Sequence, residues 1–259
     1  MTQPEYGFTR ILVDRPLAGV VRFTLNRPDR LNATDEAMHR ELAALPALLD
    51  RDDAARVAII TGAGRGFCAG GDYETLAAEA HDYARKVAMA RETLQIVAGM
   101  IECRKPIVSA INGAAAGAGL AVALLADISI AAEDATLCDG HTRIGLAAGD
   151  HAALIWPLLC GMAKAKLHLL MCSKIKGREA ERIGLVSEAL PGDAVMPRAL
   201  EIATALAAQS DLALELTKRS LNHWLRLAMP AFESSLGYEL LTSFSPEALE
   251  QVKVLRPPP

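Results

Sequence analysis

Two segments of the chain share one order of features: a short apolar run, a glycine-rich turn, and then a helix-like stretch. In the first, residues 57–61 precede the turn 62–71; in the second, residues 107–111 precede a turn that holds Gly117 and Gly119. The start of a helix leaves backbone N–H groups without partners, and glycine lets a ligand approach that backbone closely. Two such turns side by side can direct two N–H donors at one developing oxyanion.

The same turns are also compatible with tight backbone packing or with a phosphate cradle. Neither segment contains Gly-x-x-x-x-Gly-Lys-Ser/Thr, and no Gly-x-Gly-x-x-Gly motif follows a first strand. Nucleotide-phosphate loops are therefore disfavoured. Spacing alone leaves an oxyanion site as one of several interpretations.

The rest of the chain favours an α/β fold with crossover connections, because strand-like and helix-like stretches alternate in the N-terminal half. Thr34 is the expected cap of a helix in which Pro46 causes a kink or an early end. Beyond Gly149 the pattern is mostly helical. The 259 residues fit a core domain over 1–195 and a helical oligomerisation or lid region over 196–259.

The composition of the chain limits the kinds of molecule that it can bind. Net charge is −4, no basic run is present, and aromatic residues make up 4%, so nucleic acid is a poor candidate. The five cysteines are odd in number and no two form a Cys-x-x-Cys pair, which predicts a reducing compartment and no zinc ribbon.

The uncharged run 106–126 is punctuated by glycines, so we expect no membrane span there. Residues 1–5 lack the pattern of a secretion signal, and we expect a cytoplasmic protein.

Several motifs, in order along nearly the whole chain, resemble those of the crotonase (enoyl-CoA hydratase/isomerase) superfamily. These are residues 25–28 with 31–33, residues 67–72, residues 108–128 and residues 179–186. The resemblance implies an α/β fold of the crotonase type, a spiral of ββα repeats with a helical C-terminal portion. It further implies a homotrimer or a dimer of trimers, and a substrate that brings coenzyme A with it rather than a separate cofactor.

The resemblance also assigns residues. It places the two oxyanion N–H groups on Gly71 and Ala118. Further residues are expected to bind substrate: the coenzyme A segment Arg30, Leu31 and Ala33, the thioester neighbours Ala69 and Asp72, and Tyr73 beside the acyl group.

The chain departs from the hydratase pattern at both catalytic glutamates. Ala121 stands at the first position, and His141 at the most plausible second position. Alanine cannot exchange a proton, so a two-glutamate hydratase mechanism cannot operate here.

His141 and Asp150 are the predicted replacements for acid–base chemistry. A loop histidine and a helix N-cap are their simpler interpretations. His151 is expected to point elsewhere, Asp139 to be a turn residue, and His39 to be an ordinary helix residue. The spacing of His, Asp and Glu residues predicts no metal site.

We therefore expect an acyl-CoA-binding lyase or isomerase of this family, of the kind used in fatty acid metabolism, that stabilises a thioester enolate. Two alternatives remain. The stretch from Gly149-Asp150 to Trp156-Pro157 resembles that of β-diketone hydrolases, which cleave a carbon–carbon bond. Ala121 instead allows a non-catalytic acyl-CoA-binding homologue.

Overall fold

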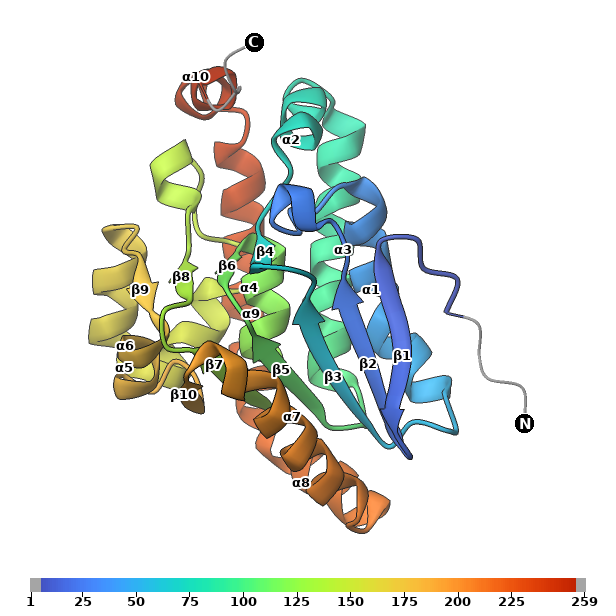
Figure 1. The fold of residues 1–259 in the computed structure, drawn as a ribbon. Helices are drawn as coiled ribbons and strands as arrows, with labels where there is room; N and C mark the ends of the chain where they lie inside the picture. The colour runs from blue at the N-terminus through green and yellow to red at the C-terminus, as the bar shows by residue number, and fades with distance from the viewer. Residues whose placement is uncertain (1–5, 255–259) are drawn as a thin grey trace.

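The chain is an α/β spiral built on two sheets, as the sequence indicates (Figure 1). The computed structural model describes residues 6–254. The main sheet has the order β1-β2-β3-β5-β7-β10, and the smaller sheet has the order β4-β6-β8-β9. The strands are β1 (Ile11–Leu17), β2 (Val20–Leu25), β3 (Val57–Gly62), β4 (Gly66–Ala69), β5 (Ile107–Ile111), β6 (Ala114–Ala116), β7 (Ile128–Ala132), β8 (Thr136–Cys138), β9 (Ile175–Lys176) and β10 (Glu188–Leu190).

After the β1–β2 hairpin and α1, three successive turns of the spiral each add one strand to each sheet and then a helical segment. β3 and β4 precede α2 and α3, β5 and β6 precede α4, and β7 and β8 precede α5. β2, β3, β5, β7 and β10 pair in parallel, whereas β1 and β2 are antiparallel. Every residue of β3 and β5 is buried, as expected for parallel strands that are covered on both faces.

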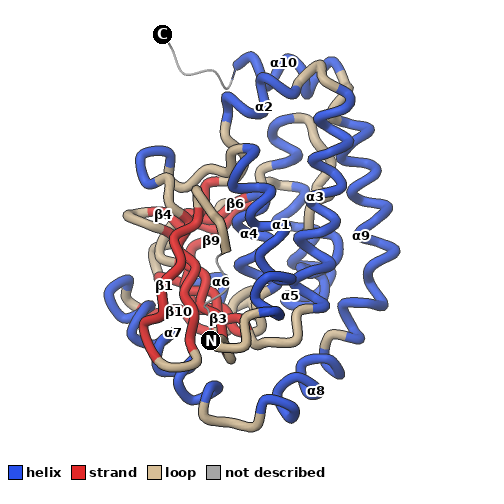
Figure 2. Tube along the Cα trace, turned by 90° about the vertical axis from the view of Figure 1, so that its right-hand side faces the viewer, coloured by secondary structure: helices blue, strands red, loops and turns tan. Residues whose placement is uncertain are grey.

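The helices lie on both sides of the main sheet (Figure 2). α7 packs against β3, β5 and β7, whereas α3 packs against α1, α4 and α9. The helices are α1 (Glu36–Arg51), α2 (Tyr73–Glu79), α3 (Tyr83–Glu102), α4 (Gly117–Leu125), α5 (Ala152–Leu170), α6 (Gly177–Arg182), α7 (Gly192–Ala207), α8 (Asp211–Leu221), α9 (His223–Thr242) and α10 (Pro246–Val254), with 3-10 turns η1 (Pro28–Arg30) and η2 (His141–Ile144).

The structure corrects the expected N-cap of α1 and excludes one of the two effects expected of Pro46, the early end. The N-cap is Asp35 rather than Thr34, because the Asp35 carboxylate accepts a hydrogen bond from the Met38 N–H. Thr34 instead pairs with Gly71 as an isolated parallel bridge. Pro46 does not end the helix early, since α1 continues to Arg51.

The expected domain boundary at 195/196 falls inside α7, whose contacts with the main sheet place it in the core. A boundary after α7 suits these contacts better, and the division itself stays a prediction. Residues 1–5, on which the absence of a secretion signal rested, lie outside the described residues, as do 255–259 of the expected helical region.

Candidate active site

A cavity of about 380 Å³ lies where the two glycine-rich turns meet the C-terminal helices. Its walls come from the turn after β4, the start of α4, η2, and parts of α1, α3, α9 and α10. Gly71, Ala118, His141 and Asp150 all line it. The structure thus brings all four predicted catalytic residues to one cavity.

The two glycine turns, residues 69–72 and 116–118, are neighbours because β4 and β6 pair in parallel with Ala69 opposite Ala116. Gly70 and Gly117 have φ angles of +94° and +49°, which L side chains rarely adopt. A Cβ atom on Gly117 would lie 3.2 Å from the Gly70 Cα. Glycine is therefore favoured where the two backbones touch, because a side chain there would be strained and crowded.

The strand pairing sets the direction of the Gly71 N–H group. The bridge to Thr34 uses the hydrogen bonds Thr34 N–H to Gly70 O and Asp72 N–H to Thr34 O. These bonds leave the Gly71 N–H on the opposite edge of the chain, the side on which β6 and α4 lie. Ala118 is the second residue of α4, so its N–H has no partner within the helix. Both donors belong to residues that line the cavity, as an oxyanion hole requires.

A polar network of Asp139, His141, Asp150, His151 and Glu239 reaches the same cavity. The first four of these residues are buried, and Glu239 is partly buried. The His141 Nδ1 atom is 3.0 Å from Asp139 Oδ1, and Asp139 also accepts the His141 backbone N–H. Its Nε2 atom is 3.5 Å from Glu239 Oε1 and 3.8 Å from Asp150 Oδ2. Asp139 therefore orients the imidazole, so that Nε2 faces two acids of the cavity wall.

The charges of the network shift the pKa values in opposite directions. Burial lowers the pKa of His141, but Asp150, Glu239 and Asp139 outweigh burial and hold it well above 6.5. Burial raises the pKa of Asp150, but His151 and His141 outweigh it and hold the carboxyl below its usual value. Burial raises the pKa of Glu239, and the neighbouring charges of Asp150 and Asp139 raise it further. His141 lowers this pKa but only partly offsets the rise. At neutral pH the network thus combines an imidazolium, an ionised aspartate and a glutamate suited to proton exchange.

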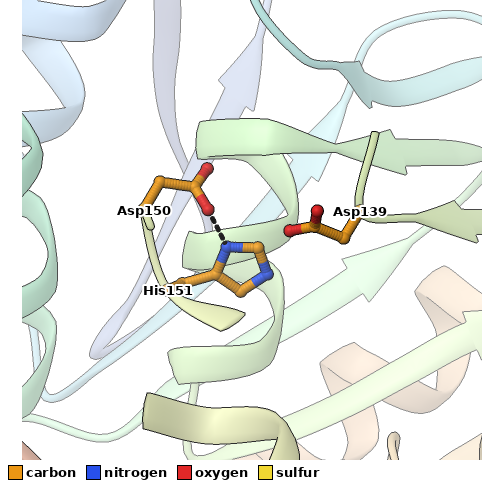
Figure 3. A group of neighbouring side chains, drawn as sticks. All are labelled: Asp139, Asp150 and His151. Atoms are coloured by element: carbon orange, nitrogen blue, oxygen red, sulfur yellow. Dashed lines mark hydrogen bonds and ion pairs between the residues drawn. The ribbon is translucent and has the colours of Figure 1, made fainter. Parts of the chain in front are cut away.

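His151 differs from its predicted position, because it is completely buried and contacts Asp150 (Figure 3). Its Nδ1 atom is 2.5 Å from Asp150 Oδ1, and the Trp156 indole N–H donates to its Nε2 atom. Since the indole can only donate, Nε2 accepts and Nδ1 carries the proton. Asp150 does not cap α5, whose N-cap residue is His151; its carboxylate is fixed by histidine instead.

Asp139, Asp150 and His151 also offer ligand atoms within 4.8 Å of one another (Figure 3). The sequence spacing gave no sign of this cluster, because Asp139 was expected to be a turn residue. Both His151 nitrogens and the Asp139 oxygens already have hydrogen-bond partners in the chain. The geometry is that of a hydrogen-bonded network, and the absence of a metal ion stays a prediction.

Glu239 is the residue that sequence reasoning missed. It comes from α9 and reaches the network over Gly149, where a Cβ atom would lie 2.5 Å from the Glu239 Cβ. Its Oε2 atom is buried and has no hydrogen-bond partner among the described residues. The only sequence signal is a glycine beside Asp150, which does not identify a partner so far along the chain.

The predicted substrate-binding residues divide into two groups. Ala69 and Asp72 line the cavity, whereas Arg30, Leu31, Ala33 and Tyr73 are not among the residues of its wall. Asp72 caps α2 and forms an ion pair of 2.8 Å with Arg27. Burial raises the pKa of Asp72, but the ion pair with Arg27 and smaller contributions from neighbouring groups together outweigh burial, so the pKa is lowered overall. This carboxylate therefore stays ionised and structures the loop.

Arg30 and Ala121 both lie outside the cavity wall. Arg30 is half-exposed and pairs with Glu74 at 3.0 Å on the outer surface. Ala121 is buried inside α4 and does not line the cavity. The position of the first hydratase glutamate therefore contributes no polar group to this cavity.

An α/β spiral in which two neighbouring glycine turns and a polar network line one cavity is typical of the crotonase class of proteins. Residues 16–247 match the family described as enoyl-CoA hydratase/isomerase. The chain belongs to this family.

Individual relatives agree with this assignment. A 1,2-epoxyphenylacetyl-CoA isomerase of Escherichia coli is 34% identical over 206 residues, which cover 79% of each chain. A probable enoyl-CoA hydratase of Mycobacterium tuberculosis is 31% identical over 88% of this chain and 82% of its own. Among solved structures, an enoyl-CoA hydratase/isomerase from Mycobacterium paratuberculosis has a TM-score of 0.90 and 36% identity, over 95% of this chain and 98% of that one. A monofunctional enoyl-CoA isomerase from M. smegmatis has a TM-score of 0.71 and 32% identity, over 87% and 99%.

Proposed function

We propose that this chain is an acyl-CoA isomerase or lyase that stabilises a thioester enolate and moves its proton with an acid–base set unlike that of the hydratases. The observation that carries the proposal is that residues of the glycine turns and of the polar network line the same cavity. Names of the relatives that refer to CoA thioesters support the substrate class.

In the proposed mechanism, the thioester oxygen accepts hydrogen bonds from the N–H groups of Gly71 and Ala118. As a proton leaves the acyl chain, negative charge collects on that oxygen, where one such donor contributes roughly 3 kcal/mol. No charged side chain has to move, because both donors are backbone groups: Gly71 is held by its bridge to Thr34, and Ala118 by its place at the start of α4.

Proton transfer is assigned to Glu239 and His141, with Asp150 as their charged neighbour. The raised pKa of Glu239 makes its carboxylate a better proton acceptor near neutral pH than Asp150, whose pKa is lowered. His141 is charged at neutral pH, because its own pKa is raised, and can return a proton to another carbon. Such a shuttle suits isomerisation better than hydration, since Ala121 and His141 stand where a hydratase has its glutamates.

The direct test uses a panel of acyl-CoA esters, including crotonyl-CoA and 3-enoyl-CoA isomers. Binding of each ester is measured by calorimetry, and its conversion by a turnover assay. We expect binding and isomerisation, with crotonyl-CoA hydration far slower. Failure of every ester to bind or react contradicts the proposal. Hydration that persists in His141→Ala and Asp150→Asn variants contradicts the residue assignments.

A carbon–carbon hydrolase of the same fold is the second candidate. The observation in its favour is the Asp150–His151 contact together with His141 beside Asp150, which can activate a water molecule as well as a carbon acid. A β-diketone without coenzyme A distinguishes the two: cleavage of the diketone with no affinity for acyl-CoA favours the hydrolase.

Oligomer formation is a further part of the proposal. Large apolar side chains are exposed on α5, α8 and α9, including Met162, Leu167, Leu170, Leu221, Trp224, Leu227 and Leu241. By length and composition, α5 is also the one described helix that could cross a membrane. Gly161 has non-helical dihedral angles inside α5, so α5 is not one continuous helix as a membrane span would be. We propose instead that neighbouring subunits of a cytoplasmic trimer or dimer of trimers cover these apolar faces. Light scattering tests this, with a monomer as the contrary result.

A further inference from the structure

A second histidine–carboxylate pair lines the same cavity, away from the polar network. His39 lies in the second turn of α1, and Glu92 lies in the middle of α3. Both are among the residues of the cavity wall. Neither belongs to the glycine turns or to the proposed proton-transfer group.

The geometry of this pair leaves one polar atom for a ligand. The His39 side chain is 11% exposed, and its Nδ1 atom is 2.6 Å from Glu92 Oε2. Among the described residues, Glu92 is the only hydrogen-bond partner of the imidazole ring. When the Nδ1–H group donates to the carboxylate, Nε2 remains an acceptor on a ring that lines the cavity.

Two other polar side chains of this cavity, those of Thr93 and Lys86, are already bonded within the protein. The Thr93 hydroxyl donates to the Met89 carbonyl, and the Lys86 ammonium donates to the Ser243 carbonyl. The surrounding wall is apolar, with Leu76, Met89, Leu236, Leu240, Leu249 and Val252. A plain hydrocarbon chain in this space would strip water from the histidine and return no hydrogen bond, which is unfavourable.

We propose that His39, held by Glu92, binds a hydroxyl group on the acyl chain, so that the substrate class is a hydroxylated acyl-CoA rather than a plain fatty acyl-CoA. This inference rests on the proposed acyl-CoA function. His39 then determines specificity and takes no part in the proton transfer. A hydroxyl fits because it donates to Nε2 and can accept from other groups or from water.

Calorimetry with saturated esters, which have no double bond to isomerise, tests the proposal. The probes are octanoyl-CoA and its monohydroxy isomers, with the hydroxyl placed at each carbon from C4 to C8. We expect at least one hydroxylated isomer to bind about tenfold more tightly than octanoyl-CoA, the effect of one well-placed hydrogen bond. In His39→Leu this preference is lost while octanoyl-CoA still binds, and in His39→Gln part of the preference remains.

His81→Leu is the matched control, because His81 is exposed and lies outside the cavity wall; its preference should equal that of the wild type. If wild-type protein binds octanoyl-CoA at least as well as every hydroxylated isomer, His39 is only a contact between α1 and α3 and the inference is overturned. That result leaves the proposed function intact. If no ester binds at all, the proposed function fails and the inference fails with it.

Discussion

The glycine turns and the polar network line one cavity, but they are built from different kinds of interaction. The turns use backbone groups from segments that are close to their own strands, and parallel pairing of β4 with β6 fixes their relative position. The network uses side chains from η2, the start of α5 and α9, which span almost one hundred residues of sequence. Local sequence therefore specifies the first half of the site, whereas tertiary packing assembles the second.

The two halves also respond differently to their surroundings. Backbone N–H groups do not titrate, so the turns should be insensitive to pH. The network is a set of coupled ionisable groups whose pKa values depend on one another. Substitutions in the turns should lower activity at every pH, and those in the network should also change the pH profile.

Glu239→Gln is expected to have the largest effect. It keeps the shape of the side chain but removes proton exchange, so kcat should fall by roughly 10²- to 10⁴-fold. Steady-state kinetics measures this. Glu233→Gln on the exposed side of the same helix is the control and should retain activity. Equal activities of the two variants would remove Glu239 from the mechanism.

Gly117→Ala tests the turns. Alanine at a φ of +49° costs about 1–2 kcal/mol, and its Cβ atom presses on the Gly70 backbone. We expect kcat to fall by about 10²-fold at every pH, from displacement of one oxyanion donor. Gly237→Ala, where a Cβ atom meets nothing within 4 Å, should keep full activity. A Gly117→Ala enzyme that loses activity at only one end of the pH range would contradict the claim that the glycine turns act independently of pH.

Asp150→Asn tests the electrostatic coupling inside the network. Asp150 is the largest of the charges that raise the pKa of His141, so the variant should have a lower His141 pKa. The alkaline limb of the pH–kcat profile should move to lower pH, so that activity falls more at alkaline pH than at neutral pH. An unmoved limb would mean that His141 does not carry the titrating proton.

Stability should depend on pH through the same residue. The folded-state pKa of His141 is raised above the unfolded value of about 6.5. Its contribution to the free energy of unfolding is therefore complete below that unfolded value and is lost as the pH rises through the folded pKa. His141→Gln should therefore lower the free energy of unfolding, and most strongly below the unfolded-state pKa. Urea unfolding should show this deficit near pH 6 and a smaller deficit at alkaline pH; a deficit that grows with pH contradicts the sign.

Arg30→Ala should have the smallest effect on the fold. Its ion pair with Glu74 is exposed, so the free energy of unfolding should change by less than about 0.5 kcal/mol. If Arg30 contacts coenzyme A, as its position in the family motif implies, the Kd for an acyl-CoA should rise severalfold. Unchanged affinity would remove Arg30 from the binding site and leave the cavity assignments intact.

The sequence predicted the fold because the informative signals are local. Buried runs such as β3 and β5, and glycines at Gly70 and Gly117, report backbone conformations that depend little on distant segments. The same signals place Gly71 and Ala118 beside the cavity, although their roles stay predictions.

The polar network was only partly predictable. His141 and Asp150 could be selected by type and motif, but Glu239 is one of many acids on C-terminal helices, and only the packing of α9 over Gly149 brings it to the site. His151 was misjudged because a residue at a helix start can turn either way, and the contacts of Asp150 and Trp156 decide it. His39 resembled an ordinary helix residue until α3 placed Glu92 beside it.

Exchange of acyl-chain protons with solvent tests the central claim most directly, since it reports enolate formation whatever the final product. A short saturated acyl-CoA is incubated with the enzyme in D₂O, and deuterium on the acyl chain is measured by mass spectrometry. We predict incorporation by the wild type and a fall of about 10²-fold or more in both Gly117→Ala and Glu239→Gln. Incorporation at the wild-type rate in both variants would contradict the claim that the glycine turns and the polar network act on one thioester.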